Sequence, residues 1–163
     1  MDKNTFTEAV LEAESTLYHI SKSILKNDSD CADAVQEAIC RAFINLHTLN
    51  DERYFKTWLC RILINECHKI SRYMRRLILF EDFMEHEQLI SEFADNGLYI
   101  AIMNLKEKLR LVVVLHYIEG FRTAEIANML SIPEGTVKSR LSKARSELKM
   151  MLNDEEEYFY EVE

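Results

Sequence analysis

The sequence predicts an all-α protein: two small helical domains joined by an acidic linker, the second ending in a helix-turn-helix. Three observations favour this fold. The 163 residues include only three glycines and one proline, so the residues that most often interrupt helices are scarce. Apolar residues recur at steps of three and four along most of the chain, which is the spacing of one helix face. Finally, 48% of the residues are hydrophobic, enough for a core in one medium domain or two small ones.

We expect three amphipathic helices in the first domain, residues 5–77, and these are residues 5–26, 30–48 and 52–77. The polar run Asn27-Asp28-Ser29-Asp30 is a helix-start signal before the second of them. The apolar face of that helix leaves an acidic outer face, formed by Asp30, Asp33, Gln36 and Glu37. An acidic outer face is ordinary for a solvated helix, and the pattern by itself favours that interpretation.

The third expected helix has an apolar side and a basic side. The apolar side contains Leu59, Leu63, Cys67, Ile70, Met74 and Leu77. The other side carries Trp58 together with a polar stripe, namely Arg61, Asn65, Lys69, Arg72 and Arg76. An aromatic ring beside cations and an amide is typical of surfaces that stack unpaired bases while holding the backbone. A lone tryptophan is more often part of a core, so both interpretations stay open here.

The net charge of −8 is unevenly distributed along the chain. Residues 53–76 hold seven cations against one acid, and residues 133–152 hold five against two. The acids gather in residues 78–95, which we predict to be the linker, and in residues 153–163, which we expect to form a disordered tail. Two basic elements in an acidic protein predict nucleic-acid binding that needs placement by a partner.

The second domain, residues 96–152, is expected to begin with one or two helices over residues 97–117. The helix-turn-helix follows over residues 119–141, where glycine and proline, the residues that most often interrupt helices, are concentrated. We expect Thr123 to cap its first helix, Ser131-Ile132 to form the turn and Pro133 to start the second helix.

The second of these two helices has the pattern of a recognition helix. One apolar stripe should face the core, namely Val137, Leu141, Ala144, Leu148 and Met151. The opposite face is narrow, with Gly135, Ser139, Ser142 and Ser146 at its centre and Lys138, Arg140 and Lys143 at its edges. Such a face suits a DNA major groove about 12 Å wide. A solvated surface helix remains the alternative.

The chain shows no pattern that predicts catalysis or a cofactor. Its four cysteines lack the CxxC spacing of zinc sites, its histidines are scattered, and no phosphate-binding glycine loop occurs. We therefore expect neither an enzyme nor a metal protein. There is no apolar run of about 18 residues and no signal-peptide pattern, so we expect a cytoplasmic protein without membrane insertion.

The two basic constellations, in this order, resemble the bacterial RNA polymerase sigma factors of the extracytoplasmic-function (ECF) group. The resemblance covers nearly the whole chain. In the first half it rests on Asp33-Ala34-Val35-Gln36-Glu37, Phe55-Lys56-Thr57-Trp58-Leu59-Cys60-Arg61-Ile62, Asn65 and residues 72–76. In the second half it rests on Glu125-Ile126-Ala127, Gly135-Thr136-Val137-Lys138-Ser139-Arg140-Leu141 and Ala144-Arg145. The chain departs from the pattern at Leu105-Lys106, where the group commonly has Leu-Pro.

The resemblance implies a role for each domain. The first would dock on the clamp helices of the largest polymerase subunit through Asp33, Gln36 and Glu37. It would also bind and melt the minus-ten promoter element, with residues 49–53 forming the pocket loop for a flipped base. The residues that would do this are Asn50, Arg53, Trp58, Arg61, Asn65, Lys69, Arg72 and Arg76. The second domain would meet the polymerase flap and recognise the minus-35 element through Thr136, Lys138, Ser139, Arg140, Ser142 and Lys143.

The resemblance thus implies a non-catalytic subunit that directs core polymerase to promoters and nucleates their opening. It also implies an anti-sigma protein as a partner. The alternative is a stand-alone helix-turn-helix regulator whose first domain senses a ligand or dimerises. That alternative leaves the basic surface around Trp58 without a role.

Overall fold

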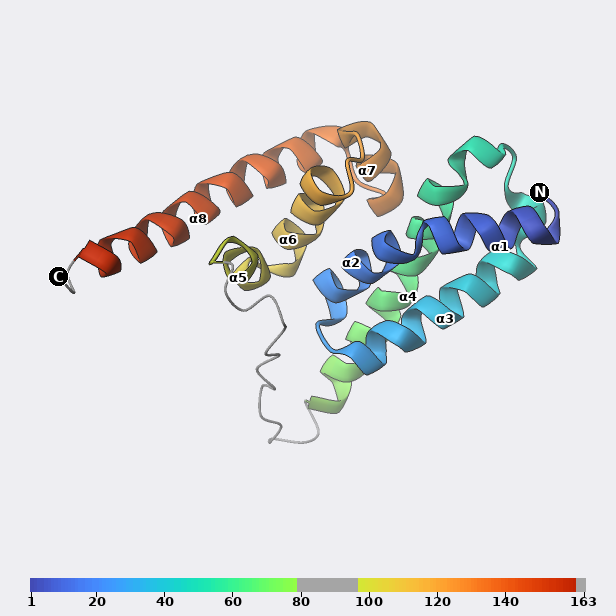
Figure 1. Ribbon diagram of the computed structural model, residues 1–163, viewed down its shortest axis with the longest axis horizontal. Coiled ribbons are helices and arrows are strands. Elements are labelled where there is room, and N and C mark those ends of the chain that lie inside the picture. Colours follow the sequence, from blue (N-terminus) through green and yellow to red (C-terminus); the bar gives the residue numbers. More distant parts are fainter. Residues whose placement is uncertain (79–96, 161–163) are drawn as a thin grey trace. The chain divides into compact units, whose positions relative to one another are not determined.

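The computed structural model describes residues 1–78 and 97–160, and within these ranges every regular element is helical (Figure 1). The chain divides into two compact units, Met1–Gln88 and Leu89–Glu163. Residues 79–95 of the predicted linker, and residues 161–163 of the predicted tail, lie outside the described residues. None of the described helices combines the length and apolar composition needed to cross a membrane.

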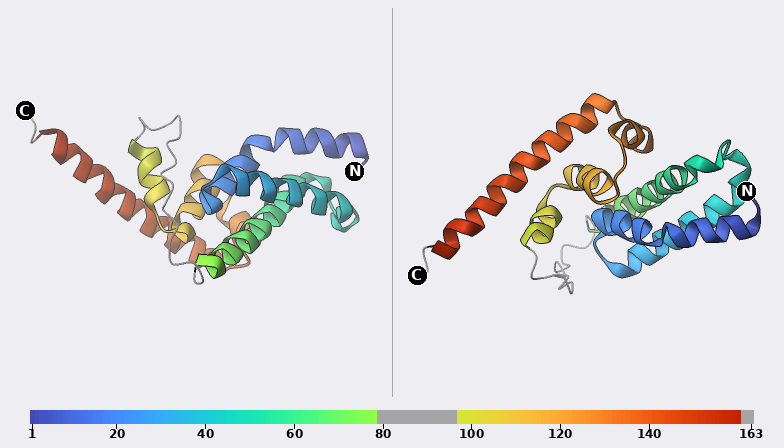
Figure 2. Two further views of the ribbon diagram at one scale, coloured as in Figure 1. Left: turned by 90° about the horizontal axis from the view of Figure 1, so that it is seen from below. Right: turned by 45° about the horizontal axis from the view of Figure 1, so that its top comes forward.

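The first unit is a bundle in which three helices, α2, α3 and α4, pack pairwise against one another (Figure 1, Figure 2). Its elements are α1 (Lys3–Glu12), α2 (Glu14–Leu25), α3 (Asp28–Ile44), the 3-10 turns η1 (Leu46–Thr48) and η2 (Glu52–Tyr54), and α4 (Phe55–Ile78). The core draws on α2, α3 and α4. Its fully buried side chains include Leu17, Ile20, Leu59, Leu63 and Ile64, together with the α3 alanines Ala34, Ala38 and Ala42. Phe6 of α1 joins this core through edge-on contacts with Phe43 and Phe55.

The prediction of one helix over residues 5–26 is wrong, because the helix breaks at Ala13. This residue has φ −87° and ψ −2°, and its N–H is shared between the carbonyls of Ala9 and Val10. The break lets Phe6 reach Phe55 while the next helix turns Leu17 into the core. No glycine or proline marks this site in the sequence, so only the packing of both segments could locate it.

The ends of the next two predicted helices also shift. The helix expected over residues 30–48 begins at Asp28, because the Asn27 side chain accepts a hydrogen bond from the Asp30 N–H at 2.8 Å. Its last expected turn is the separate element η1. The helix expected from residue 52 begins at Phe55, after η2.

In the second unit, three shorter helices pack against one long helix, α8 (Figure 1, Figure 2). Its elements are α5 (Gly97–Asn104), α6 (Glu107–Val113), the π-helical turn η3 (Val114–Ile118), α7 (Thr123–Leu130) and α8 (Glu134–Tyr160). The core cluster contains Leu105, Leu109, Val113 and Ala144. The two helices predicted as possible over residues 97–117 are therefore separate, and the strand-like run of valines is buried helix as predicted.

Arg110 shapes the turn where the chain departs from the ECF pattern. This side chain is only 3% exposed, and its Nη1 donates to the carbonyls of Met103 at 3.0 Å and Leu105 at 2.7 Å. It thereby satisfies carbonyls at the end of α5 that lack helical partners. Burial lowers the pKa of Arg110. The arginine stabilises the turn at Leu105-Lys106 without a proline.

The helix-turn-helix forms where predicted, with two local differences. Arg122, not Thr123, is the cap residue of α7, and its N–H donates to the Glu125 carboxylate at 2.8 Å. Ser131 adopts the left-handed conformation at the turn, with φ 54°. Pro133 precedes α8 rather than starting it, since its carbonyl accepts the first helical hydrogen bonds from Thr136 and Val137.

The long helix α8 continues well past the predicted end of the domain. It runs to Tyr160, so the expectation of a disordered tail from residue 153 is wrong as far as that residue. Leu148 and Met151 pack against the core cluster of the second unit, which continues the apolar stripe predicted from Val137.

Candidate nucleic-acid interface

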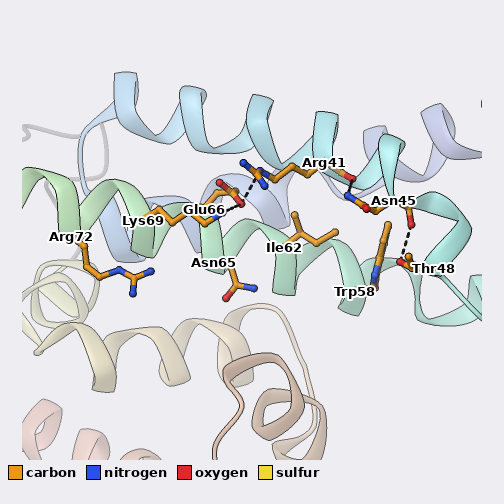
Figure 3. Close-up of a pocket in the computed structure, with 9 residues that line it drawn as sticks. All are labelled: Arg41, Asn45, Thr48, Trp58, Ile62, Asn65, Glu66, Lys69 and Arg72. Carbon is orange, nitrogen blue, oxygen red and sulfur yellow. Dashed lines mark hydrogen bonds and ion pairs between the residues drawn. The ribbon is translucent and has the colours of Figure 1, made fainter.

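An open groove of about 450 Å³ lies in the first unit, between the C-terminal end of α3 and the side of α4 (Figure 3). It is lined from α3 and the turn after it by Arg41, Asn45 and Thr48, and from α4 by Trp58, Ile62, Asn65, Glu66, Lys69 and Arg72. In Figure 3, Trp58, Asn65 and Arg72 project from the same side of α4. Four of the predicted minus-ten residues therefore share one groove: Trp58, Asn65, Lys69 and Arg72.

Trp58 lies between the core and the solvent. Its ring centroid is 6.1 Å from that of Phe55, which is 4% exposed, with the planes tilted by 46°. Trp58 itself is only partly buried and lines the groove. An indole that contacts a buried ring and is partly exposed at a groove can serve as a platform on which a base stacks.

Two cations of the groove, Arg41 and Lys69, belong to a network that joins α3 to α4. The Nε of Arg41 donates to the Glu37 carboxylate at 2.7 Å and lies 3.1 Å from the Glu66 carboxylate. The Nζ of Lys69 donates to the same Glu66 carboxylate at 2.7 Å. Positive and negative side chains thus alternate across the two helices, from Glu37 to Lys69.

Arg41 and Glu66 are not among the site residues predicted from the sequence. Glu66 is the single acid among residues 53–76, and it stands one turn before Lys69. This isolated acid, one turn before a lysine, is a signal in the sequence that marks Glu66. No such signal marked Arg41, because only the pairing of α3 with α4 brings it to the groove.

The other predicted minus-ten residues do not line the groove. Arg61 and Arg76 are exposed on α4, and Asn50 is exposed in the segment before it. The Arg53 side chain donates to the Asp51 carboxylate from Nε, at 3.1 and 3.0 Å, and from Nη2, at 2.7 Å. The hydrogen bonds from Arg53 lower the pKa of Asp51.

The predicted polymerase-binding residues share an exposed surface of α3. Asp33, Gln36 and Glu37 are all exposed. Their spacing of three and four places them along one side of the helix. Glu37 is also the residue that bonds Arg41, so this acidic surface adjoins the groove network.

The recognition helix α8 is oriented as its pattern predicts. Val137, Leu141 and Ala144 are buried, whereas Lys138, Ser139, Ser142 and Lys143 are exposed. Thr136 and Arg140 are partly buried at the edges of the exposed face. A Cβ added at Gly135 would meet no atom within 4 Å, so the start of this face is open.

Glu134, which is not among the predicted site residues, is the first residue of α8 and links the two helices of the motif. Its carboxylate accepts a hydrogen bond from the Thr123 hydroxyl at 2.7 Å and lies 3.0 Å from the Lys138 ammonium. The bond from Thr123, followed by that from Lys138, lowers the pKa of Glu134. Thr123 therefore acts across the turn rather than as a cap.

Metal chemistry has no visible basis in the parts of the chain that are described. Across residues 1–78 and 97–160, no three His, Cys, Asp or Glu side chains gather as metal ligands do. The four cysteines carry free thiols, with Cys40 exposed and the other three buried.

Comparison with known families finds two matches, one in each unit. The family model for Sigma-70 region 2 matches residues 10–77, and the model for Sigma-70, region 4 matches residues 98–148. Among curated proteins, the chain is 29% identical to the ECF RNA polymerase sigma factor SigW of Bacillus subtilis, covering 94% of this chain and 91% of the relative. It is 25% identical to SigV of the same species, covering 96% and 99%.

Solved structures agree on the fold. The sigma factor RpoE of Bartonella quintana, solved in complex with the anti-sigma factor NepR, superposes with a TM-score of 0.78 at 24% identity. The alignment covers 91% of this chain and 97% of RpoE. CnrH, solved with the cytosolic domain of CnrY, gives a TM-score of 0.70 at 24% identity, covering 94% and 90%.

Proposed function

The chain belongs to the sigma-70 family as a sigma factor of the ECF group, and from this premise we propose how its two units divide the work of transcription initiation. Such a factor is not an enzyme; it binds RNA polymerase and directs it to promoter DNA. We assign residues 5–77 to polymerase binding and to the minus-ten element, and residues 96–152 to the minus-35 element. Residues 78–95 are the acidic linker between them, and residues 153–163 form an acidic tail. The stand-alone regulator is not favoured, because both sigma regions match.

The acidic surface of α3 docks on the polymerase core. Asp33, Gln36 and Glu37 are exposed and present carboxylates and an amide to the basic clamp helices of the largest subunit. Charge pairing of this kind directs encounter and fixes register. The second unit meets the polymerase flap, so the two halves of the protein are placed together on the enzyme.

The groove between α3 and α4 holds the unpaired minus-ten strand, and its composition is the observation that carries this proposal. Trp58 stacks a base, worth about 1–3 kcal/mol, which offsets the few kcal/mol needed to extract that base from the duplex. Lys69 and Arg72 hold the backbone, and Asn65 bonds a base edge. Asn50 and Arg53 serve in the loop that takes the flipped base, and Arg61 and Arg76 extend the backbone contacts along α4.

The exposed face of α8 enters the major groove of the minus-35 element. Lys138, Ser139, Ser142 and Lys143 stand at the N-terminal half of the helix, which is the part that meets base edges in helix-turn-helix proteins. Thr136 and Arg140, at the edges of this face, are placed for backbone contacts. The net charge of −8 opposes binding of the free protein to DNA, so recognition occurs within the polymerase complex.

An anti-sigma protein is the expected regulator, and the chain acts in the cytoplasm, where polymerase and promoter DNA are found. The sigma factor RpoE was solved in complex with an anti-sigma factor, and CnrH was solved with the cytosolic domain of CnrY. This supports a similar mode of control for the present chain.

Reconstituted transcription tests the proposed function. Purified protein added to bacterial core polymerase should yield discrete transcripts from a cognate promoter selected from genomic fragments. Core polymerase alone is the control. If no fragment gives a transcript, yet the protein binds duplex DNA tightly without polymerase, the stand-alone regulator is the correct alternative.

A further inference from the structure

Glu66 is the one acidic side chain that lines the α3–α4 groove in the described part of the chain. Its side chain is 8% exposed, so it is nearly out of contact with water. A buried carboxylate is costly unless charged or hydrogen-bonding groups compensate it. Its place in a groove proposed to hold a polyanion therefore requires an explanation.

The compensation for Glu66 comes from two cations that line the same groove. Lys69 lies 2.7 Å away on α4, and Arg41 lies 3.1 Å away on α3 (Figure 3). One buried carboxylate thus contacts a cation from each wall. Lysine and arginine side chains otherwise have many rotamers, and ordering them costs conformational entropy. Contact with a fixed carboxylate supplies that order before DNA arrives.

We propose that Glu66 is the positioning residue of this groove, holding Arg41 and Lys69 where they meet the phosphates of the opened minus-ten strand. Arg41 is then a DNA-binding residue contributed by α3, outside the predicted set on α4. The proposal rests on the proposed function of the groove. On this proposal, the correct placement of Arg41 and Lys69 speeds strand opening by more than the negative charge of Glu66, which repels the strand, slows it.

Arg41 also connects the groove to the polymerase-binding surface. Its single Nε–H donates to Glu37, while the Glu66 carboxylate lies beside the same nitrogen. One N–H cannot serve both carboxylates fully. Arg41 therefore lies at the boundary between the polymerase-binding surface and the groove.

The substitution Glu66→Gln separates placement from charge, because the two predict opposite signs. The amide keeps the size of the side chain but removes a negative charge, so a groove governed by charge alone would bind the strand better. If Glu66 positions the cations, opening slows by about tenfold or more. Holoenzyme made with the variant is assayed for closed-complex affinity and, separately, for opening by 2-aminopurine fluorescence in the minus-ten element.

We expect closed-complex affinity to stay within about twofold, as for a change that misses that contact surface, while opening alone is slowed. Glu12→Gln is the matched control, since it removes the same charge from an exposed position on α1 and should leave both steps unchanged. Equal or faster opening by Glu66→Gln holoenzyme would overturn the proposal.

A second variant covers the case in which Glu66→Gln does not fold, which thermal melting followed by circular dichroism would reveal. Arg41→Lys keeps the charge but loses the planar guanidinium, whose Nε lies between Glu37 and Glu66. It should slow opening while polymerase affinity holds. Where Glu66→Gln does fold, adding it to Arg41→Lys should cause little further loss. Normal opening by Arg41→Lys would show that Arg41 is not a DNA-binding residue of the groove and would refute the proposal.

Failure of this proposal is distinguishable from failure of the proposed function. If the groove does not hold DNA at all, then Trp58→Ala also opens the promoter normally. If only the positioning idea is wrong, Trp58→Ala is impaired while Glu66→Gln and Arg41→Lys behave like the unchanged protein.

Discussion

The two basic helices, α4 and α8, present their charges in opposite ways. On α4, Lys69 and Arg72 stand at a hollow that includes a partly buried tryptophan. On α8, Lys138 and Lys143 flank exposed serines on an outward-facing ridge. A ridge with a narrow centre fits the major groove of a paired duplex, whereas a hollow with an aromatic wall receives bases that have left the stack.

The two regions also differ in how rigidly their cations are held. Lys69 is tied to a buried carboxylate that itself contacts a second helix through Arg41. Among the described residues, Lys138 pairs with the exposed Glu134, one turn away on the same helix. Exposed pairs of this kind contribute little stability. We infer that the opening surface is preformed, whereas the duplex surface adapts to its target.

The largest expected effect comes from Trp58→Ala, which tests whether the groove on α4 receives unpaired bases. Loss of one stacking contact, about 1–3 kcal/mol, should slow promoter opening roughly 5- to 150-fold. Duplex binding through the minus-35 element should be unchanged. Permanganate reactivity of minus-ten thymines measures the opening, and Trp58→Phe, which keeps a ring, should restore most of it. An unchanged footprint in Trp58→Ala would assign the indole to the core alone.

Next in size is Lys138→Ala, which tests the ridge on α8. If this ammonium contacts a base edge, discrimination at one minus-35 position should fall by about 1–3 kcal/mol. Competition between promoters that differ at single minus-35 bases measures it in the holoenzyme. A uniform weakening for all sequences, with the salt slope smaller by about 1, would instead mean a phosphate contact.

The comparison also shows what the sequence could and could not predict. Helical spacing correctly placed Val137, Leu141 and Ala144 in the core, and so fixed the exposed face of α8. That success followed because periodicity within one helix determines which residues share a side. Composition along α4 similarly predicted that Trp58 would lie on the same side as Asn65 and Lys69.

The features that were missed depend on contacts between helices. Arg41 reaches the groove because α3 packs against α4, and Thr123 leaves its expected cap role because Glu134 lies across the turn. The break at Ala13 likewise follows from where two segments pack. Pattern within a segment carries no information about its partner, so these contacts required the structure.

A smaller effect is expected from Glu134→Gln, which removes the ion pair that Glu134 makes with Lys138. Removing the carboxylate frees the ammonium and adds a net positive charge near DNA. Affinity for unrelated sequences in the holoenzyme should therefore rise, while preference for the cognate minus-35 element falls by less than about threefold. The ratio of the two affinities is the measurement. A large loss of preference would mean that Glu134 itself contacts a base.

The smallest effect concerns the ionisation of Glu134, and it tests whether the hold across the turn exists in solution. Hydrogen bonds from Thr123 and then Lys138 keep its pKa below the ordinary value of 4.5. The folded protein therefore favours the carboxylate, so this contribution is complete above the ordinary pKa and is lost as pH falls through the lowered one. Carbon-detected NMR titration of the side chain should give a midpoint below 4.5. In Thr123→Ala the midpoint should rise towards that value, because the largest cause of the shift is gone. An unchanged midpoint would mean that the Thr123 hydroxyl does not bond Glu134 in solution. The start of α8 would then be held even less firmly, relative to the cations of α4, than the structure indicates.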